Sequence, residues 1–388
     1  MTSNTQVITP REIAGVMEYH WSANTPVLFM GPSGCGKSAT VEQFARAKGK
    51  ELGYPHFWKY GEALPADPAN TFALLDLRLA SMDAADLKGF GSLDIVNGKT
   101  VFLTPEMLPD INVHGAAGYV FADEIDKADD GAVDAWSQIM LTGAIGTYVL
   151  PDTYRIASAA NRKQDGTGGG KVKSHIVNRG GTYEVEPSVA DWSAFDLSQG
   201  GSPVVHAFMR SVGAAYIYAR DKADVAFASA RSWSNASRVV QTVEDPDLAR
   251  KLVAGFVGKA ASDTLAGFQS LVASGAEIPS FAAVIADPMT APIPSESNEH
   301  KNALAYAAIG IIANNVKTGN FTHEHMEAVL AYGGRLDKEH CTTLMFDLRV
   351  RDNAKLNPDH ELYDADWHSL FNTQAALTWI ADNPNANV

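Results

Sequence analysis

The sequence has few cysteines and no apolar run long enough to cross a membrane. Its 388 residues include two cysteines, Cys35 and Cys341, which cannot form a disulfide framework, so we expect a reducing compartment. The longest apolar run, Ala305 to Ala313, is too short to span a bilayer. Because no charged segment followed by an apolar stretch begins the sequence, we expect no secretory signal and a cytoplasmic location.

Basic residues are also in the minority. The chain has 31 lysines and arginines against 45 aspartates and glutamates, which gives a net charge of −14. No stripe of lysine and arginine is visible, and this argues against a dedicated nucleic-acid grip, although assembly could still build a locally basic pore. We expect neither a nucleic acid nor a membrane to be the main partner.

One glycine-rich segment matches a complete phosphate-binding pattern. A glycine, four free residues and Gly-Lys-Ser follow the apolar run 26–30 and precede a helical pattern over 39–47. Glycines let successive N–H groups point inward, and the helix start adds partial positive charge. Lys37 is expected to reach the β- and γ-phosphates, and Ser38 to bind Mg²⁺. The residues expected to bind a nucleoside triphosphate are Gly31, Pro32, Ser33, Gly34, Cys35, Gly36, Lys37, Ser38 and Ala39.

A pair of adjacent carboxylates predicts that the bound nucleoside triphosphate is also hydrolysed. The apolar run 118–122 predicts a strand that ends in Asp123 and Glu124. In an open parallel sheet, ligands lie at the carboxyl ends of the strands. Asp123 is therefore expected to hold the Mg²⁺ shell, and Glu124 to polarise the attacking water.

A third apolar run, 154–160, predicts a strand that ends in Asn161. A polar side chain at that edge can share the water with Glu124 and respond to the γ-phosphate. Taken alone, an asparagine after a strand is more often a turn residue. The stronger signal is the order of three motifs on three separate strands: phosphate loop, acidic pair and polar strand end.

That order resembles the AAA+ ATPases, with Walker A at 31–38, Walker B at Asp123-Glu124 and sensor 1 at Asn161. The chain is most similar to the MoxR-type branch, on Asp76-Leu77-Arg78, Asp86-Leu87-Lys88-Gly89 and Ala159-Ala160-Asn161-Arg162. The resemblance covers about residues 10–245 well. It implies an α/β fold: a P-loop AAA+ core with a parallel sheet, followed by an α-helical lid and a C-terminal helical region.

Two loop segments divide the sequence. Gln199-Gly200-Gly201-Ser202-Pro203 is a natural break, and 286–297 is rich in proline and serine. We therefore expect a nucleotide-binding core over 1–200, a helical lid over 201–290 and a helical extension over 291–388. Gly166 to Lys171 resembles a second phosphate loop, but Val172 replaces the required hydroxyl residue, and we interpret it as a flexible loop.

The resemblance implies active sites between subunits, each completed by an arginine from a neighbour. Arg179 stands where the family places this finger, although Gly180 replaces the usual aromatic residue. Arg162, directly after sensor 1, competes for the role, and a plain surface salt bridge stays open for either residue. Arg231 resembles the sensor 2 arginine, but the proline that often precedes it is missing, so a structural arginine at a helix start is the alternative.

An inserted hairpin is a further feature of the MoxR-type branch. Here Asn97-Gly98 joins two apolar runs within 89–108, which is a local hairpin signal in its own right. The resemblance implies that such a hairpin faces a central pore and touches a client protein; an ordinary surface hairpin is the alternative.

The resemblance also implies a homo-oligomeric ring, most often a hexamer, that binds ATP and Mg²⁺ and remodels or activates a separate client, often one with a von Willebrand A-type domain. The chain has no Asp-x-Ser-x-Ser signature of its own. Two alternatives stay open: a nucleic-acid-directed AAA+ motor, and a nucleotide-gated binding module with little turnover. No base-reading motif separates ATP from GTP.

Overall fold

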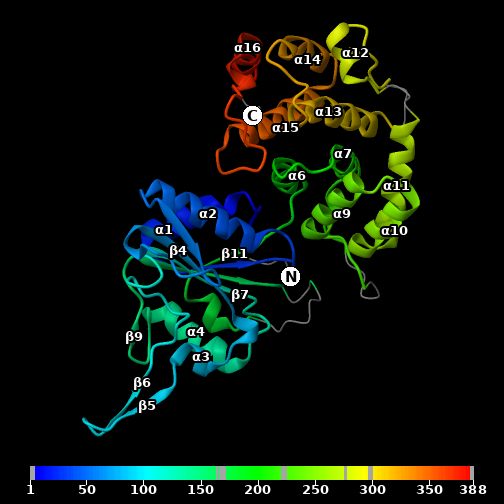
Figure 1. Ribbon diagram of the computed structural model, residues 1–388. Coiled ribbons are helices and arrows are strands. Elements are labelled where there is room, and N and C mark those ends of the chain that lie inside the picture. Colours follow the sequence, from blue (N-terminus) through cyan, green and yellow to red (C-terminus); the bar gives the residue numbers. More distant parts are fainter. Residues whose placement is uncertain are drawn as a thin grey trace. The chain divides into compact units, whose positions relative to one another are not determined.

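The computed structural model describes residues 5–162, 165, 172–219, 225–274, 278–295 and 300–384. Contacts divide the chain into two compact units, Met1–Pro187 and Ser188–Val388, and we describe each by itself (Figure 1). The glycine-rich loop expected over 166–171 lies outside the described residues.

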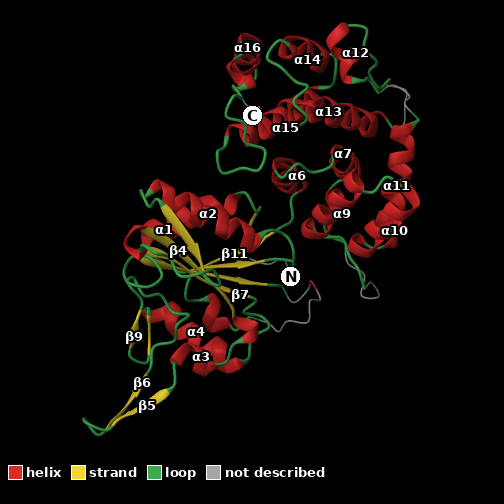
Figure 2. Ribbon diagram, viewed as in Figure 1, coloured by secondary structure: helices red, strands yellow, loops and turns green. Residues whose placement is uncertain are grey.

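The first unit is built on a seven-stranded sheet in which every neighbouring pair is parallel (Figure 2). Its central strands are buried along their length, as expected when helices cover both faces of a parallel sheet. In spatial order the strands are β1 (Gln6–Ile8), β11 (Gly181–Val185), β2 (Val27–Met30), β10 (Tyr154–Ala160), β7 (Ala117–Asp123), β4 (Thr71–Arg78) and β3 (His56–Lys59).

Successive residues of each strand point to opposite sides of the sheet, so helices can pack on both of its faces. Phe29 and Phe121 belong to the core under α1 (Glu12–Ala23) and α2 (Lys37–Glu51). Their neighbours Leu28 and Val120 belong to a second core with Trp136 of α4 (Asp130–Thr142). The same core includes residues of α3 (Ala84–Lys88) and α5 (Ser174–Val177).

Two small antiparallel pairs complete the first unit, β5 (Gly91–Asp94) with β6 (Lys99–Phe102) and β8 (Ala144–Ile145) with β9 (Tyr148–Val149). The β5–β6 pair projects from the unit, as Figure 1 shows, and confirms the hairpin expected around Asn97-Gly98. Its turn places Gly98 at φ +62°, and Asn97 donates its backbone N–H to Asp94 Oδ1 at 3.1 Å.

The second unit is helical and shares one hydrophobic core, which runs in sequence from Trp192 to Ala376. Its helices are α6 (Val189–Ser198), α7 (Pro203–Val212), α8 (Ala214–Ile217), α9 (Ala230–Thr242), α10 (Pro246–Val257), α11 (Lys259–Ala273), α12 (Phe281–Ala286), α13 (Lys301–Lys317), α14 (His325–Gly333), α15 (Lys338–Leu356) and α16 (Gln374–Asp382).

The α/β fold class is confirmed: a P-loop core with a parallel sheet, followed by a helical region. The division between the units lies at Pro187 rather than near residue 200, because α6 packs with the helices that follow it. Trp192 of α6 stacks on His206 of α7, with ring centroids 4.6 Å apart. The separation of a lid over 201–290 from an extension over 291–388 stays a prediction, since residues of both ranges share the core.

Candidate nucleotide site

The phosphate loop, 31–38, connects the carboxyl end of β2 to the start of α2. Gly34 and Gly36 have φ of +77° and +107°, which disfavour any residue with a side chain. At Gly31 a Cβ atom would lie 2.4 Å from the carbonyl oxygen of Val185, so only glycine fits against β11. The backbone of the loop therefore requires glycine at these three positions of the motif.

Lys37 is the first residue of α2, and its buried side chain folds back into the loop. Its Nζ donates hydrogen bonds to the carbonyl oxygens of Gly31 at 2.7 Å and Pro32 at 3.0 Å. The ammonium group thus lies within the loop that leads to the amino end of this 15-residue helix. Both favour an anion, as expected for a phosphate cradle.

Ser38 and Asp123 meet although they are far apart in the sequence. Ser38 Oγ donates to Asp123 Oδ2 at 2.5 Å, and Asp123 is buried at the end of β7. A hydroxyl and a carboxylate are the hard oxygen donors that suit Mg²⁺. Within the described residues no group of three or more His, Cys, Asp and Glu side chains is placed to hold a metal, so a cation here would complete its shell with water and phosphate oxygens.

Glu124 directly follows Asp123 and has an unusual backbone conformation. Its φ is +58°, and its N–H donates to Asp123 Oδ1 at 2.8 Å. A residue other than glycine costs about 1–2 kcal/mol in this region, and such strain gathers at functional sites. The Glu124 carboxylate accepts a hydrogen bond from Lys127 Nζ at 2.7 Å and is partly exposed. A carboxylate with access to solvent can accept a proton from water.

Asn161 follows β10, which lies between β2 and β7, so it stands between the phosphate loop and the acidic pair. Its backbone N–H donates to Asp126 Oδ1 at 2.8 Å, and its Nδ2 donates to Asp126 Oδ2 at 3.2 Å. Asp126 was not predicted as a site residue. Its position three residues after Asp123 was the available signal, but the pairing with Asn161 depends on the alignment of β7 and β10.

The two candidate finger arginines have partners inside the first unit. Arg162 Nε lies 3.0 Å from Asp165 Oδ2, and Arg162 Nη1 lies 2.6 Å from Glu184 Oε1. Burial disfavours the charged form of Arg162, but the hydrogen bonds that it donates to the two carboxylates raise its pKa above the ordinary value. Arg179 Nη1 donates to the carbonyl oxygen of Ser137 on α4. The finger role of Arg179 or Arg162 therefore stays a prediction.

Arg231 lies in the first turn of α9 in the second unit and is exposed. The helix begins with a capping box in which Ser229 and Ser232 satisfy each other's backbone N–H groups. The helix start therefore has its own cap and does not depend on the arginine. The sensor 2 role of Arg231 stays a prediction.

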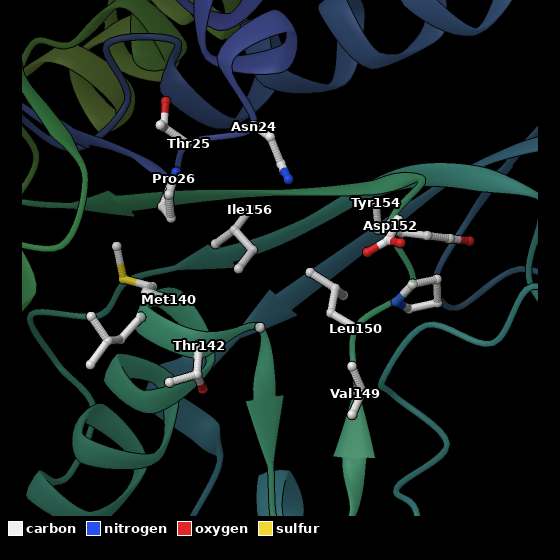
Figure 3. Close-up of a pocket in the computed structure, with 13 residues that line it drawn as sticks. Asn24, Thr25, Pro26, Met140, Thr142, Val149, Leu150, Asp152, Tyr154 and Ile156 are labelled. Carbon is white, nitrogen blue, oxygen red and sulfur yellow. The ribbon is translucent and has the colours of Figure 1, made fainter.

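A cavity of about 290 Å³ lies elsewhere in the first unit (Figure 3). Its wall includes Pro26, which precedes β2, and Tyr154, which begins β10, so it lies at the amino ends of the strands, opposite the phosphate loop. The described residues that line it include no lysine, arginine or histidine. It offers no cationic side chain for a phosphate, and the nucleotide site is better placed at the loop.

No protein-family model and no curated protein matches the chain. Among solved structures it is similar to a single-residue variant of RuvB from Thermotoga maritima, at 12% identity over 66% of this chain and 67% of that one, with a TM-score of 0.35. It is similar to a putative ATPase from Cytophaga hutchinsonii at 11% identity over 88% and 82%, with a TM-score of 0.30. It is also similar to NtrX from Brucella abortus in complex with ATP, at 14% identity over 91% of this chain and 68% of that one, with a TM-score of 0.35.

These neighbours are AAA+ ATPases. At such identities and TM-scores we take no function from them, and the MoxR-type branch receives no support from them. No helix within the described ranges is long and apolar enough to cross a membrane.

Proposed function

We propose that this chain is a Mg²⁺-dependent ATPase of the AAA+ type. The observation that carries the proposal is a convergence at one edge of the sheet. Lys37 and Ser38 begin the helix that follows β2, Asp123 ends β7 and Glu124 follows it, and Asn161 follows β10, which lies between those two strands. Because the three strands are parallel, all five residues lie at the edge where α/β sheets bind ligands.

Each residue has a role that its contacts support. The loop N–H groups and Lys37 bind the β- and γ-phosphates, and Ser38 and Asp123 hold the cation shell. When bound, Mg²⁺ neutralises charge that develops on the phosphate oxygens. Glu124 accepts a proton from the water whose oxygen bonds to the γ-phosphorus, as the bond from that phosphorus to the β–γ bridging oxygen breaks. Asn161, held by Asp126, positions that water.

An arginine from a second copy would complete the site, and this makes a ring, most simply a hexamer, part of the proposal. Arg179 is our first candidate and Arg162 the second. We further propose a MoxR-like task, the remodelling or activation of a separate client, possibly one with a von Willebrand A-type domain. The β5–β6 hairpin supports a client contact, because Leu93, Ile95 and Val96 are exposed at its tip, Val96 to 93%. Apolar side chains gathered on such a projection are typical of protein contacts.

The test is the steady-state ATPase rate per subunit over a wide range of protein concentration. A rate that rises and saturates is expected if assembly completes the site. A constant rate down to concentrations at which light scattering shows only monomers would contradict a shared site. Absence of both hydrolysis and nucleotide binding would contradict the proposal as a whole.

A nucleotide-gated binding module with little turnover is the second candidate. It is favoured by one observation: Lys127 Nζ donates to one oxygen of the Glu124 carboxylate, and this ion pair weakens the carboxylate as a base towards water. The Lys127→Ala variant separates the two. If this ion pair keeps the enzyme idle, the variant hydrolyses ATP faster than the wild type, whereas a binding module stays inactive in both forms.

A further inference from the structure

Arg78 occupies a place in the site that the proposed roles do not explain. It ends β4, directly opposite Asp123 in the β4–β7 register. Its Nη1 donates to Asp123 Oδ2 at 2.9 Å, and its Nη2 lies 3.9 Å from Asp76 Oδ2. The Arg78 guanidinium group is therefore hydrogen-bonded to the same Asp123 carboxylate that we propose as a ligand in the cation shell.

The hydrogen bonds at Asp123 show that the Arg78 contact occupies a position that a cation would need on the carboxylate. A carboxylate oxygen has about two acceptor positions, and Oδ2 accepts from both Ser38 Oγ and Arg78 Nη1. The other oxygen, Oδ1, accepts from the Glu124 N–H. Ser38 can keep its bond while its hydroxyl offers a lone pair to a cation, because the hydroxyl donates one hydrogen and has two lone pairs. Arg78 is thus the group that a cation or its bound water must displace.

Arg78 is also the member of the pair that is free to leave. Its side chain is 53% exposed, whereas that of Asp123 is 7% exposed. Asp76 does not depend on it, because Lys59 Nζ lies 3.2 Å from Asp76 Oδ2 and 2.6 Å from Glu42 Oε2. Departure of Arg78 would also end its 3.9 Å pair with Asp76, but both ion pairs of Lys59, with Asp76 and with Glu42, would remain.

We propose that Arg78 is a positioning residue that compensates Asp123 in the metal-free site and is exchanged for the divalent cation when a nucleotide loads. The exchange replaces one positive partner of Asp123 with another, so the buried carboxylate keeps a partner throughout the cycle. This inference rests on the proposed function. It makes Arg78 a competitor of the cation and a determinant of its affinity.

The experiment measures binding of Mn²⁺ to the ADP-loaded protein, with free Mn²⁺ followed by electron paramagnetic resonance. Arg78→Gln is expected to bind Mn²⁺ about two- to fivefold more tightly, a modest factor because Arg78 is half exposed. Arg78→Lys keeps the charge and should restore the competition in part. Lys59→Gln is the matched control, because it removes a nearby positive charge that does not contact Asp123. The Mn²⁺ affinity of this variant should match that of the wild type.

Thermal unfolding gives a second readout that does not depend on turnover. In EDTA, Arg78→Gln should melt below the wild type, since Asp123 has lost a partner, and the difference should close with Mn²⁺ and ADP. A gap that persists with Mn²⁺ and ADP, or an Mn²⁺ affinity that is unchanged or weaker in Arg78→Gln, overturns the inference alone. A wild-type protein that binds neither ADP nor Mn²⁺ overturns the proposed function as well.

Discussion

Ser38 Oγ and Asp123 Oδ2 lie 2.5 Å apart across 85 residues of sequence. This bond joins the end of the phosphate loop to the strand that carries the acidic pair. We expect Ser38→Ala to lose about tenfold or more of its affinity for ATP in Mg²⁺, because a bond to a charged group is removed and the cation loses a ligand. Titration with a fluorescent ATP analogue in Mg²⁺ and in EDTA checks this. Ser38→Thr keeps the hydroxyl and should bind normally; equal weakening in EDTA would contradict a role in the cation shell.

Substitutions of Glu124 should affect the stability of the fold and the rate of ATP hydrolysis in different ways. At φ +58° a glycine is not strained, so Glu124→Gly should unfold with a free energy about 1 kcal/mol above that of Glu124→Ala. Both variants, and Glu124→Gln, should hydrolyse ATP about 10²- to 10⁴-fold more slowly than the wild type and still bind it. Urea unfolding and ATPase rates provide the measurements. Unchanged turnover in Glu124→Gln would remove Glu124 from its assigned role.

Mixing of subunits identifies the finger. We expect Arg179→Ala to bind ATP yet hydrolyse it about 10³- to 10⁵-fold more slowly, because the transition-state charge loses its partner. Adding Glu124→Gln subunits should rescue part of the activity, since some interfaces then pair an intact arginine with an intact glutamate. Arg162→Ala is the matched comparison. Rescue of Arg162→Ala, with none for Arg179→Ala, would transfer the role to Arg162.

Much of the first unit could be predicted because its signals are local. The apolar runs that end at Asp123 and Asn161 became β7 and β10 with almost the expected bounds, and the Asn97-Gly98 turn became the β5–β6 hairpin. The partners of the site residues could not be predicted in this way. Arg78 meets Asp123, and Asp126 meets Asn161, only because separate strands align. Strand register is a tertiary property that no single stretch of sequence carries.

The longest described helix, α15, lies within the expected helical extension, but its own bounds could not be predicted, for a related reason. Its buried positions include Asp347, Arg351 and Asp352, so its inner face does not show the apolar period that predicts a helix. The two carboxylates find partners outside the helix, Arg210 of α7 for Asp347 and Ser369 for Asp352. Within the range expected to form a helical lid, Gly258, whose φ is +86°, separates α10 from α11.

The buried pair of Arg210 and Asp347 predicts a large loss of stability. Arg210 donates to both carboxylate oxygens, at 2.6 and 2.8 Å, and Asp347 is fully buried. Asp347→Ala should lower the free energy of unfolding by about 3–5 kcal/mol, because Arg210 is left without its partner. The double variant Arg210→Met, Asp347→Leu should recover only part of this loss, because the buried Arg351 guanidinium also loses the opposite charge of Asp347. Asp337→Ala, which breaks an exposed pair with Lys301, should cost less than about 1 kcal/mol. Similar losses in both single variants would contradict the importance of burial.

His206 predicts how stability depends on pH. The ring is buried, lies 2.9 Å from Asp196 Oδ2 and stacks on Trp192. Burial lowers the pKa of His206 below its ordinary value of about 6.5, although Asp196 opposes this. Below about pH 6.5 the unfolded chain therefore takes up a proton before the folded protein does, and stability falls as the pH decreases towards the folded pKa. Above pH 6.5 this contribution is fully present.

The measurement is the slope of the unfolding free energy against pH, from urea unfolding between pH 5 and 7. In His206→Gln the slope should be smaller by up to about 1.4 kcal/mol per pH unit, the contribution of one proton. Ser193→Ala removes the hydroxyl 3.2 Å from His206 Nδ1 and keeps the titrating ring, so it should lower stability while retaining most of the slope. If His206→Gln has the wild-type slope, the proton that links pH to folding lies on another group.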